Sequence, residues 1–88
     1  MKIIVEPHTL KRASERGATE KEIFDVINEG IVIPAKKDRF AKAKIFDYNK
    51  FWNDKYYEKK RIEVIYTIEH EEIVTVTVYV FYGKWEKT

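Results

Sequence analysis

The C-terminal third of the chain alternates in hydrophobicity with a period of two, the spacing of side chains along a β-strand. One face of segment 73–82 carries Val74, Val76, Val78, Val80 and Tyr82. The opposite face carries Ile73, Thr75, Thr77, Tyr79 and Phe81. Segment 60–69 alternates in the same way, and a polar turn at 70–72 separates the two segments. We therefore expect a hairpin whose all-valine face packs under helices, while its Thr/Tyr face stays open.

Shorter apolar runs predict the remaining strands. Segment 2–5 indicates a short strand or an extended lead-in, and segment 31–33 indicates a short strand that ends at Pro34. Residues 40–48 alternate moderately well, which favours a longer strand. Residues 49–59 mix polar and aromatic side chains, so we expect a connection or the tip of a hairpin there.

The region before these strands predicts two helices. The first covers about residues 8–16 and is followed by Gly17, the residue type preferred where a helix ends in the left-handed conformation. The second begins with the capping box formed by Thr19 and Glu22, and we expect Gly30 to close it as Gly17 closes the first. Its apolar stripe consists of Ile23, Phe24, Val26 and Ile27.

Together these elements predict a single α+β domain over residues 1–88. We expect a two-helix hairpin packed on a twisted antiparallel sheet of about four strands, with an extended or β-stranded lead-in before the first helix.

Composition excludes several kinds of site. The chain has no cysteine, so it has no disulfide and no thiolate ligand or nucleophile. His8 and His70 lack metal-ligand spacing, so we expect neither a metal site nor another cofactor. The apolar run at residues 3–5 is too short for a signal peptide and no longer run could span a bilayer, so we expect a cytoplasmic protein without membrane contact. Heavy use of Lys and Glu without any Gln is typical of proteins from hot environments.

The positive charge is concentrated in the middle of the chain. The protein has a formal net charge of +2, yet residues 36–61 contain ten basic and four acidic side chains. This segment favours a polyanionic partner, although a solvated basic loop would have the same composition. Its basic and aromatic residues include candidates for RNA binding, namely Lys36, Lys37, Arg39, Lys42, Lys44, Trp52, Lys55 and Lys60.

Two other clusters could carry chemistry. On the first predicted helix, His8, Arg12, Glu15 and Arg16 share one face, where they could bind phosphate and transfer protons. An ordinary solvent-exposed face with one ion pair would have the same pattern. On the predicted hairpin, polar residues of neighbouring strands could form one patch, although such residues also occur on ordinary solvated sheets. This patch consists of Arg61, Glu63, Thr67, Thr75, Thr77 and Tyr79.

One sequence pattern resembles a known group of proteins. It is H-x3-R-x2-E-R-G from His8 to Gly17, followed by E-I-x2-V-I-x2-G from Glu22 to Gly30 and by a terminal strand with Thr77-Val78-Tyr79. The pattern resembles short proteins grouped with the RelE/ParE-like toxins, within the barnase–EndoU–colicin–RelE nuclease superfamily.

The resemblance implies a RelE-like fold and a metal-independent endoribonuclease, the toxin of a toxin–antitoxin system. Such enzymes cleave RNA, in some cases ribosome-bound mRNA, by attack of the ribose 2′-OH, and a cognate antitoxin protein neutralises them. His8 would act as general base or acid, because imidazole exchanges protons near neutral pH. Glu15 or Glu63 would orient it or act as its partner. Phosphate would be held by Arg12, Arg16 and Arg61, and Tyr79 would donate a hydrogen bond or stack on a base.

Two other functions are compatible with the sequence. The first is a non-catalytic RNA- or protein-binding domain on the same scaffold. The second is an interaction protein that binds an antitoxin-like peptide by strand addition. The nuclease hypothesis requires the polar stripe of the first helix and the Thr/Tyr face of the hairpin to meet around one positively charged hollow.

Overall fold

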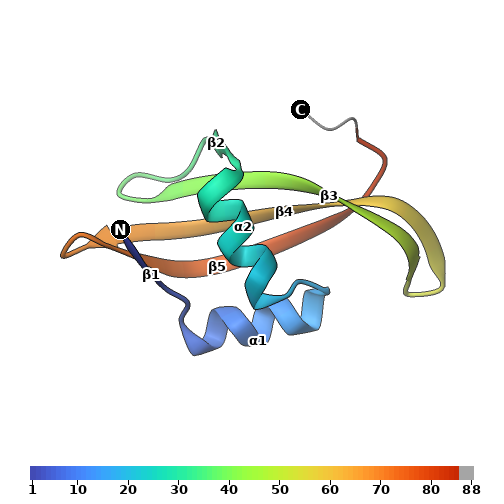
Figure 1. The fold of residues 1–88 in the computed structure, drawn as a ribbon, viewed down its shortest axis with the longest axis horizontal. Helices are drawn as coiled ribbons and strands as arrows, with labels where there is room; N and C mark the ends of the chain where they lie inside the picture. Colours follow the sequence, from blue (N-terminus) through green and yellow to red (C-terminus); the bar gives the residue numbers. More distant parts are fainter. Residues whose placement is uncertain (86–88) are drawn as a thin grey trace.

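Both helices pack on one face of a single sheet (Figure 1). The computed structural model describes residues 1–85. The elements are β1 (Lys2–Ile4), α1 (Pro7–Arg16), α2 (Glu20–Glu29), β2 (Ile31–Ile33), β3 (Phe40–Trp52), β4 (Lys55–Glu69) and β5 (Glu72–Gly83). The predicted α+β class and the predicted pair of helices are confirmed.

Within residues 1–85 the sheet has five strands, in the order β1-β5-β4-β3-β2. Neighbouring strands are antiparallel except β1 and β5, which run parallel with Ile3 beside Ile73. The sheet therefore differs from the expected one of about four antiparallel strands. The lead-in becomes a full strand because Ile3 and Val5 pack against the core, which holds β1 against β5.

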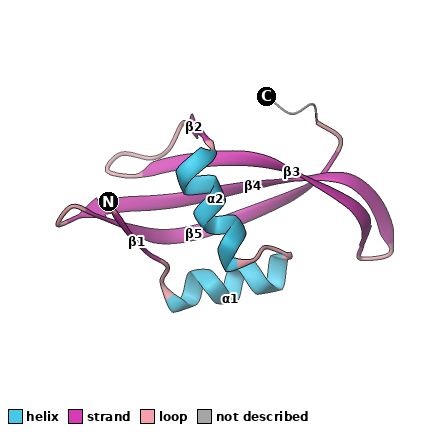
Figure 2. Cartoon of the chain, viewed as in Figure 1, coloured by secondary structure: helices cyan, strands magenta, loops and turns pink. Residues whose placement is uncertain are grey.

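Residues 49–59 were expected to be a connection or the tip of a hairpin, and they form a hairpin, because strands β3 and β4 extend through them. Their turn consists only of Asn53 and Asp54, whose φ angles are 49° and 66°. Asn and Asp tolerate this left-handed conformation, which two-residue hairpin turns require. Near Asn49, which has φ 52°, the β3–β4 register shifts. The result is a curved two-stranded arm that projects past the helices (Figure 2).

A bulge in β5 changes which side chains face the helices. Ile65 lies opposite Thr77 and the next residue, Tyr66, lies opposite Thr75, so Val76 is the extra residue. Val78 is fully buried under the helices, as predicted. Beyond the bulge the alternation inverts, because one inserted residue shifts all later side chains to the other face. The prediction of a continuous valine face was therefore wrong.

Thr75 illustrates the consequence of this inversion. It was expected in a polar patch on the open face, but it is buried on the helix side with 1% exposure. Its hydroxyl accepts a hydrogen bond from the backbone N–H of Glu6 at 3.0 Å and donates one to the Thr9 hydroxyl at 3.0 Å. Thr75 therefore fastens the start of α1 to the sheet, because a buried hydroxyl requires such partners.

The two helices end differently. The capping box of α2 is present: the Thr19 hydroxyl accepts from the Glu22 N–H at 3.1 Å, and the Glu22 carboxylate accepts from the Thr19 N–H at 3.0 Å. Gly17 ends α1 in the predicted left-handed conformation, with φ 88°. Gly30 ends α2 in an extended conformation, so its expected left-handed role was wrong. A Cβ there would lie 2.7 Å from the Ala43 carbonyl oxygen. The absence of a side chain at Gly30 therefore lets the end of α2 approach β3 closely.

The core lies between the helices and the sheet. Its fully buried aliphatic side chains include Ile23, Val26, Ile62, Val64 and Val78, and burial of each such side chain contributes about 1.5–3 kcal/mol. The opposite surface of the sheet carries no helix, and we call it the outer face. By strand register it consists of Ala41, Ala43 and Ile45 on β3, Arg61, Glu63 and Ile65 on β4, and Thr77, Tyr79 and Phe81 on β5.

We expect Gly17→Ala to destabilise the protein by about 2 kcal/mol or more, because a side chain there is strained in the left-handed region. A Cβ at this position would also lie 2.1 Å from the Tyr82 hydroxyl. Urea unfolding measures the change. Ser14→Ala, an exposed position on the same helix, is the control and should change stability by less than about 0.5 kcal/mol. Equal stability of the two variants would contradict this account of the turn.

Candidate nucleic-acid interface

The polar stripe of α1 lies along the edge of β5. Strand β1 covers this edge only as far as Val74. Beyond it, Nε2 of His8 lies 2.8 Å from the Val76 carbonyl oxygen, and Nη1 of Arg16 donates to the Val78 carbonyl oxygen at 2.5 Å. These two side chains therefore satisfy backbone groups that an edge strand would otherwise expose.

Arg16 also reaches the outer face. Its guanidinium carbon lies 5.3 Å from the centre of the Tyr79 ring, within the range of a cation–π contact. Tyr79 belongs to the outer face and is 43% exposed. The helix stripe and the Thr/Tyr side of the hairpin therefore meet at the β5 edge. The other two members of the stripe, Arg12 and Glu15, are exposed on α1.

The middle of the outer face holds an ion pair. Nε of Arg61 donates to Oε2 of Glu63 at 3.0 Å, and the two side chains are only 25% and 22% exposed. Glu63 lies directly between Ala43 on β3 and Tyr79 on β5. Ala41 and Ala43 are 1% exposed although no helix covers them. Ala43 lines the smaller of two hollows beside the ion pair, and we call these two hollows together with the ion pair the groove.

Two hollows flank the ion pair. The larger, about 700 Å³, lies between the β2–β3 loop and the strands, and its lining includes Lys36, Lys37, Arg39, Ile65, Thr77 and Tyr79. The smaller, about 240 Å³, is lined by Glu29, Gly30, Ile31, Ala43, Lys44, Ile45 and Arg61. Glu63 lies between Arg61 and Ile65 on the same face of β4, so it separates the hollows.

The groove combines cations with an exposed aromatic ring. Lys36, Lys37 and Arg39 line the larger hollow, Arg16 enters from the β5 edge and Arg61 lies at the centre. Lysine and arginine neutralise phosphates, while an aromatic ring such as that of Tyr79 can stack on an unpaired base. This arrangement suits a single strand of nucleic acid.

Three of the predicted RNA-binding lysines lie on the helix side of the sheet. Nζ of Lys42 donates to the Ile27 carbonyl at the end of α2 at 2.8 Å, and Lys44 forms an ion pair with Glu29. Lys60 is the third. Because alternate residues of a strand point to opposite faces, a basic segment in a strand cannot present all its charges on one surface. These three lysines therefore point away from the outer face, and their role in RNA binding stays a prediction.

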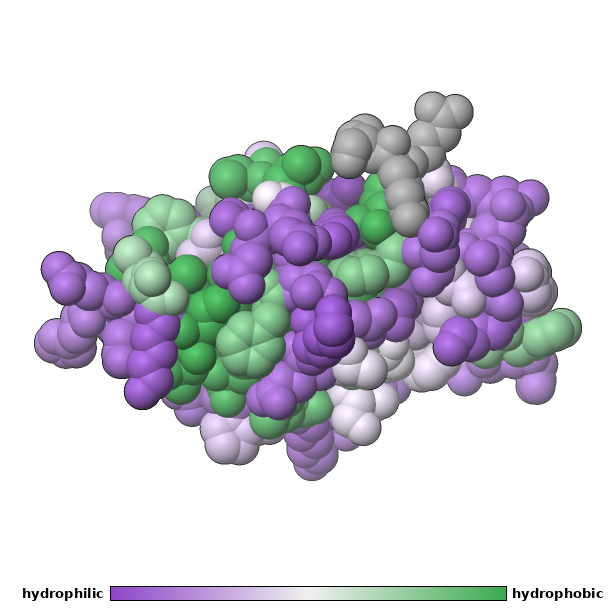
Figure 3. Space-filling view, viewed as in Figure 1, coloured by the Kyte–Doolittle hydropathy of each residue, from purple (hydrophilic) through white to green (hydrophobic). Residues whose placement is uncertain are grey.

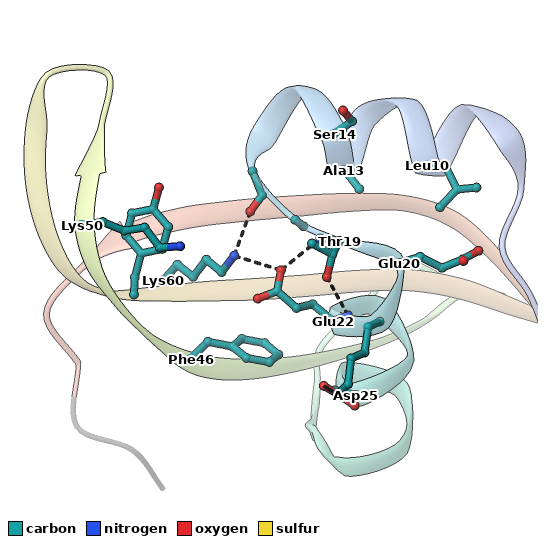
Figure 4. Close-up of a pocket in the computed structure, with 14 residues that line it drawn as sticks. Leu10, Ala13, Ser14, Thr19, Glu20, Glu22, Asp25, Phe46, Lys50 and Lys60 are labelled. Atoms are coloured by element: carbon teal, nitrogen blue, oxygen red, sulfur yellow. Dashed lines mark hydrogen bonds and ion pairs between the residues drawn. The ribbon is translucent and has the colours of Figure 1, made fainter.

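Lys60 is buried, with 6% of its surface exposed. Nζ donates to the Gly17 carbonyl oxygen at 2.8 Å and to Oε1 of Glu22 at 2.9 Å. Figure 4 shows it pointing from β4 toward the turn between the helices, beside the capping box of Thr19 and Glu22. It borders a hollow of about 880 Å³ between this turn and the arm. Its role in this structure is to hold the helix turn on the sheet.

The arm holds the last two predicted RNA-binding residues. Trp52 stacks on Tyr82 with a centroid distance of 5.0 Å and an interplanar angle of 15°. Lys55 is exposed near the arm turn, with Nζ 5.5 Å from the centre of the Tyr57 ring. Trp52 therefore belongs to an aromatic cluster that closes the end of the core, away from the groove.

Within residues 1–85 no cluster of three or more His, Cys, Asp or Glu side chains could hold a metal ion. In the same range, none of the helices has the length and apolar character needed to cross a membrane. On the face that carries the helices, hydrophilic side chains cover most of α2 and the arm, and hydrophobic ones gather beside α2 and along β2 (Figure 3).

Comparison with protein families gave one match. The model of a domain of unknown function, DUF4258, matches residues 5–80, which is most of the chain. The chain belongs to the DUF4258 family. Neither the search of curated proteins nor the search of solved structures gave a match.

Sequence reasoning missed three contributors to the groove of this DUF4258 domain. Ala43 lines its smaller hollow, Ala41 lies beside Ile65 on the same face, and Phe81 is 46% exposed on its β5 side. The alternation of alanine with lysine over residues 41–44 was a usable signal, because small residues at alternate positions leave room on one face of a strand.

Lys60→Met should destabilise the DUF4258 domain by about 2–4 kcal/mol, because it removes one partner of a largely buried ion pair and leaves the other unpaired. Urea unfolding measures this change. Lys59→Met, at the adjacent position, is the matched control: Lys59 forms a more exposed ion pair with Asp47, and its loss should change stability by less than about 1 kcal/mol. If the two variants were equally stable, Lys60 would not hold the helix turn.

Tyr82 gives the domain a pH-dependent contact. Its hydroxyl donates to the Arg16 carbonyl oxygen at 2.6 Å. Burial, with smaller contributions from Tyr48 and Glu22, raises the pKa of Tyr82 from 10.0 to about 12. The folded state therefore favours the neutral phenol, so this contribution to stability is present below pH 10.0 and is lost as the pH rises toward about 12.

An alkaline titration followed by tyrosinate absorbance tests this assignment. The wild type should show a late step near pH 12 that Tyr82→Phe lacks. The stability of Tyr82→Phe should also fall less between pH 10 and 12 than that of the wild type. Tyr56→Phe, at a residue that is 49% exposed, controls for the loss of one tyrosine. Burial also raises the pKa of Tyr66, which titrates in both proteins. A step near pH 12 that keeps its full amplitude in Tyr82→Phe would refute the assignment.

Proposed function

We propose that this DUF4258 domain is a RelE-like endoribonuclease, the toxin of a toxin–antitoxin pair, which binds one RNA strand along the outer face and cleaves it without a metal ion. One observation supports this most: Arg16 passes from α1 around the β5 edge to Tyr79, beside a hollow lined by Lys36, Lys37 and Arg39. The two residue groups that the hypothesis required to meet are therefore joined at a basic hollow.

The sequence resemblance and the arrangement of the elements support the same proposal. The motif that resembles RelE/ParE-like toxins includes α1 and α2. In its α1 part the first and last polar positions, His8 and Arg16, both reach β5. In the proposal, these positions serve a site that begins at the β5 edge and continues across the outer face to Arg61.

Cleavage would proceed by in-line attack. The 2′-oxygen forms a bond to the adjacent phosphorus while the bond from phosphorus to the 5′-oxygen breaks, which leaves a cyclic 2′,3′-phosphate and a 5′-hydroxyl. One group must take the 2′-OH proton, another must give a proton to the 5′-oxygen, and cations must stabilise the phosphorane. In the proposal, Glu63 takes the proton, because its carboxylate lies between Tyr79 and the Arg61 guanidinium. Arg61 and Arg16 stabilise the negative charge.

His8 would act at the edge of this site. Its Nε2 faces the Val76 carbonyl, which can only accept a hydrogen bond, so the proton of a neutral ring lies on Nε2 and Nδ1 carries the lone pair. Protonation of Nδ1 from solvent makes the ring the acid that gives a proton to the 5′-oxygen, and Nδ1 regains a proton from solvent before the next turnover. In this arrangement His8 shuttles a proton while its Nε2 remains bound to β5.

A non-catalytic binding domain is the second candidate, and one feature favours it. Ile31 and Phe81 are 52% and 46% exposed on the outer face, and they border the groove with apolar surface that the cleavage reaction does not use. In this case Arg61 and Glu63 would position a bound strand or a protein partner without chemistry.

The decisive experiment incubates single-stranded RNA with wild type and with Glu63→Gln in the presence of EDTA. A separate arm presents mRNA on translating ribosomes in their own Mg²⁺ buffer. We expect cyclic-phosphate products from the wild type and a loss of rate of about 100-fold or more in Glu63→Gln, the usual contribution of a proton-transfer group. Lys21→Ala is the matched control, since Lys21 is exposed on α2 and pairs with Asp25 of the same helix, and it should cleave like the wild type.

RNA binding is measured in parallel. Lys36→Ala combined with Lys37→Ala should weaken binding. In a plot of the logarithm of the binding constant against the logarithm of salt concentration, the magnitude of the slope should fall by about one unit per lost phosphate contact. Binding without cleavage in both conditions would favour the non-catalytic domain. Equal cleavage by wild type and Glu63→Gln would exclude Glu63 as the base, and absence of both activities would exclude the outer face as an RNA site.

A further inference from the structure

The two edges of the sheet are protected differently. The edge of β5 is covered by β1 and then by His8 and Arg16 of α1. At the other edge lies β2, and within residues 1–85 no strand pairs with its outer side. Ile31 is 52% exposed and Val32 is 77% exposed there. The three-residue length of β2 limits this exposed edge, and Pro34 follows the strand, but β2 itself carries no charge, proline or bulge.

We propose that β2 is an interface between two copies of this chain, paired antiparallel about a two-fold axis at Val32. This inference stands apart from the proposed nuclease function, because it depends on the β2 edge and not on the groove. The pairing would join the two sheets into one continuous sheet, with the helices of both copies on the same side. Figure 3 shows hydrophobic side chains along the margin where β2 lies.

The strand is complementary to itself in this arrangement. With the axis at Val32, Ile31 of each copy lies opposite Ile33 of the other, and Val32 lies opposite its own equivalent. Directly opposed residues of antiparallel strands point to the same face. The two isoleucine pairs therefore extend the outer face, while the two valines meet on the helix side and bury the apolar side chain that is 77% exposed in one copy.

Charge also favours a second copy. In antiparallel pairing, the residues that precede β2 in one copy lie beside the residues that follow β2 in the other copy. The segment before β2 ends α2 with Glu29, whose side chain is 60% exposed, and the segment after β2 carries Lys36 and Lys37. Each acidic helix end would thus approach the basic loop of the other copy. The two basic loops would lie at opposite ends of the pairing and would not repel each other at close range.

The interface is small, because each copy contributes a three-residue strand and its flanks. Contacts below about 1,000–1,200 Å² of total buried area are usually transient. We therefore expect a reversible dimer whose fraction rises with protein concentration.

A cysteine at the axis tests the pairing directly. Opposed residues of antiparallel strands have Cα atoms about 4.5–5.5 Å apart, within the range that a disulfide spans. The chain has no cysteine of its own, so Val32→Cys introduces a single thiol. Under mild oxidation we expect it to form a disulfide-linked dimer faster than Phe51→Cys, the control at an arm position that is 68% exposed.

Sedimentation equilibrium gives an independent readout without cross-linking. The wild type should associate as its concentration rises, Val32→Lys should remain monomeric with an unchanged circular dichroism spectrum, and Phe51→Lys should associate like the wild type. A monomeric wild type combined with equal cross-linking of the two cysteine variants would overturn the proposal. A dimer that persists in Val32→Lys would place the interface elsewhere and would also overturn it.

Discussion

A buried ammonium group fixes the turn between the two helices on the sheet, and the position of Arg16 at the β5 edge depends on it. Nζ of Lys60 binds the Gly17 carbonyl and the Glu22 carboxylate, and the Tyr82 hydroxyl binds the preceding carbonyl, that of Arg16. Two consecutive carbonyls at the end of α1 are thus held by two strands. This places the last turn of α1 beside β5, and from there the Arg16 side chain reaches both the Val78 carbonyl and the Tyr79 ring.

The features of the fold that were predicted correctly are local ones. The capping box of Thr19 and Glu22 and the left-handed Gly17 are determined within a few residues, so the sequence pattern alone identifies them. The bulge at Val76 was missed because a bulge adds one residue without interrupting the alternating hydrophobic pattern, which continues through valines on both sides. For the arm, a connection and a hairpin tip were both left open, because its turn, Asn53-Asp54, lacks the glycine that most clearly marks a two-residue turn.

The candidate site was predicted less completely. The sequence shows how charged residues follow one another along the chain, but it does not show which face of the sheet each one occupies. Arg16 and Tyr79 do meet, since both lie at the β5 edge. Lys42 and Lys60 lie on the helix side, where they bind a backbone carbonyl near the end of each helix. A lysine whose ammonium group satisfies a helix carbonyl has the same sequence signal as one that binds phosphate. Only the strand register distinguishes the two roles.

The Arg16 side chain has two roles, because it protects the β5 edge and also supplies a cation to the proposed site on the outer face. Because its guanidinium satisfies the Val78 carbonyl, its removal would expose the β5 edge as well as remove a cation from the groove. Loss of activity in an Arg16 variant would therefore not separate the two effects. Glu63 contacts Arg61 on a face that no helix covers, so its amide variant keeps the shape of the groove while it removes the charge and the proton acceptor. The chemistry of this domain is therefore best tested at Glu63.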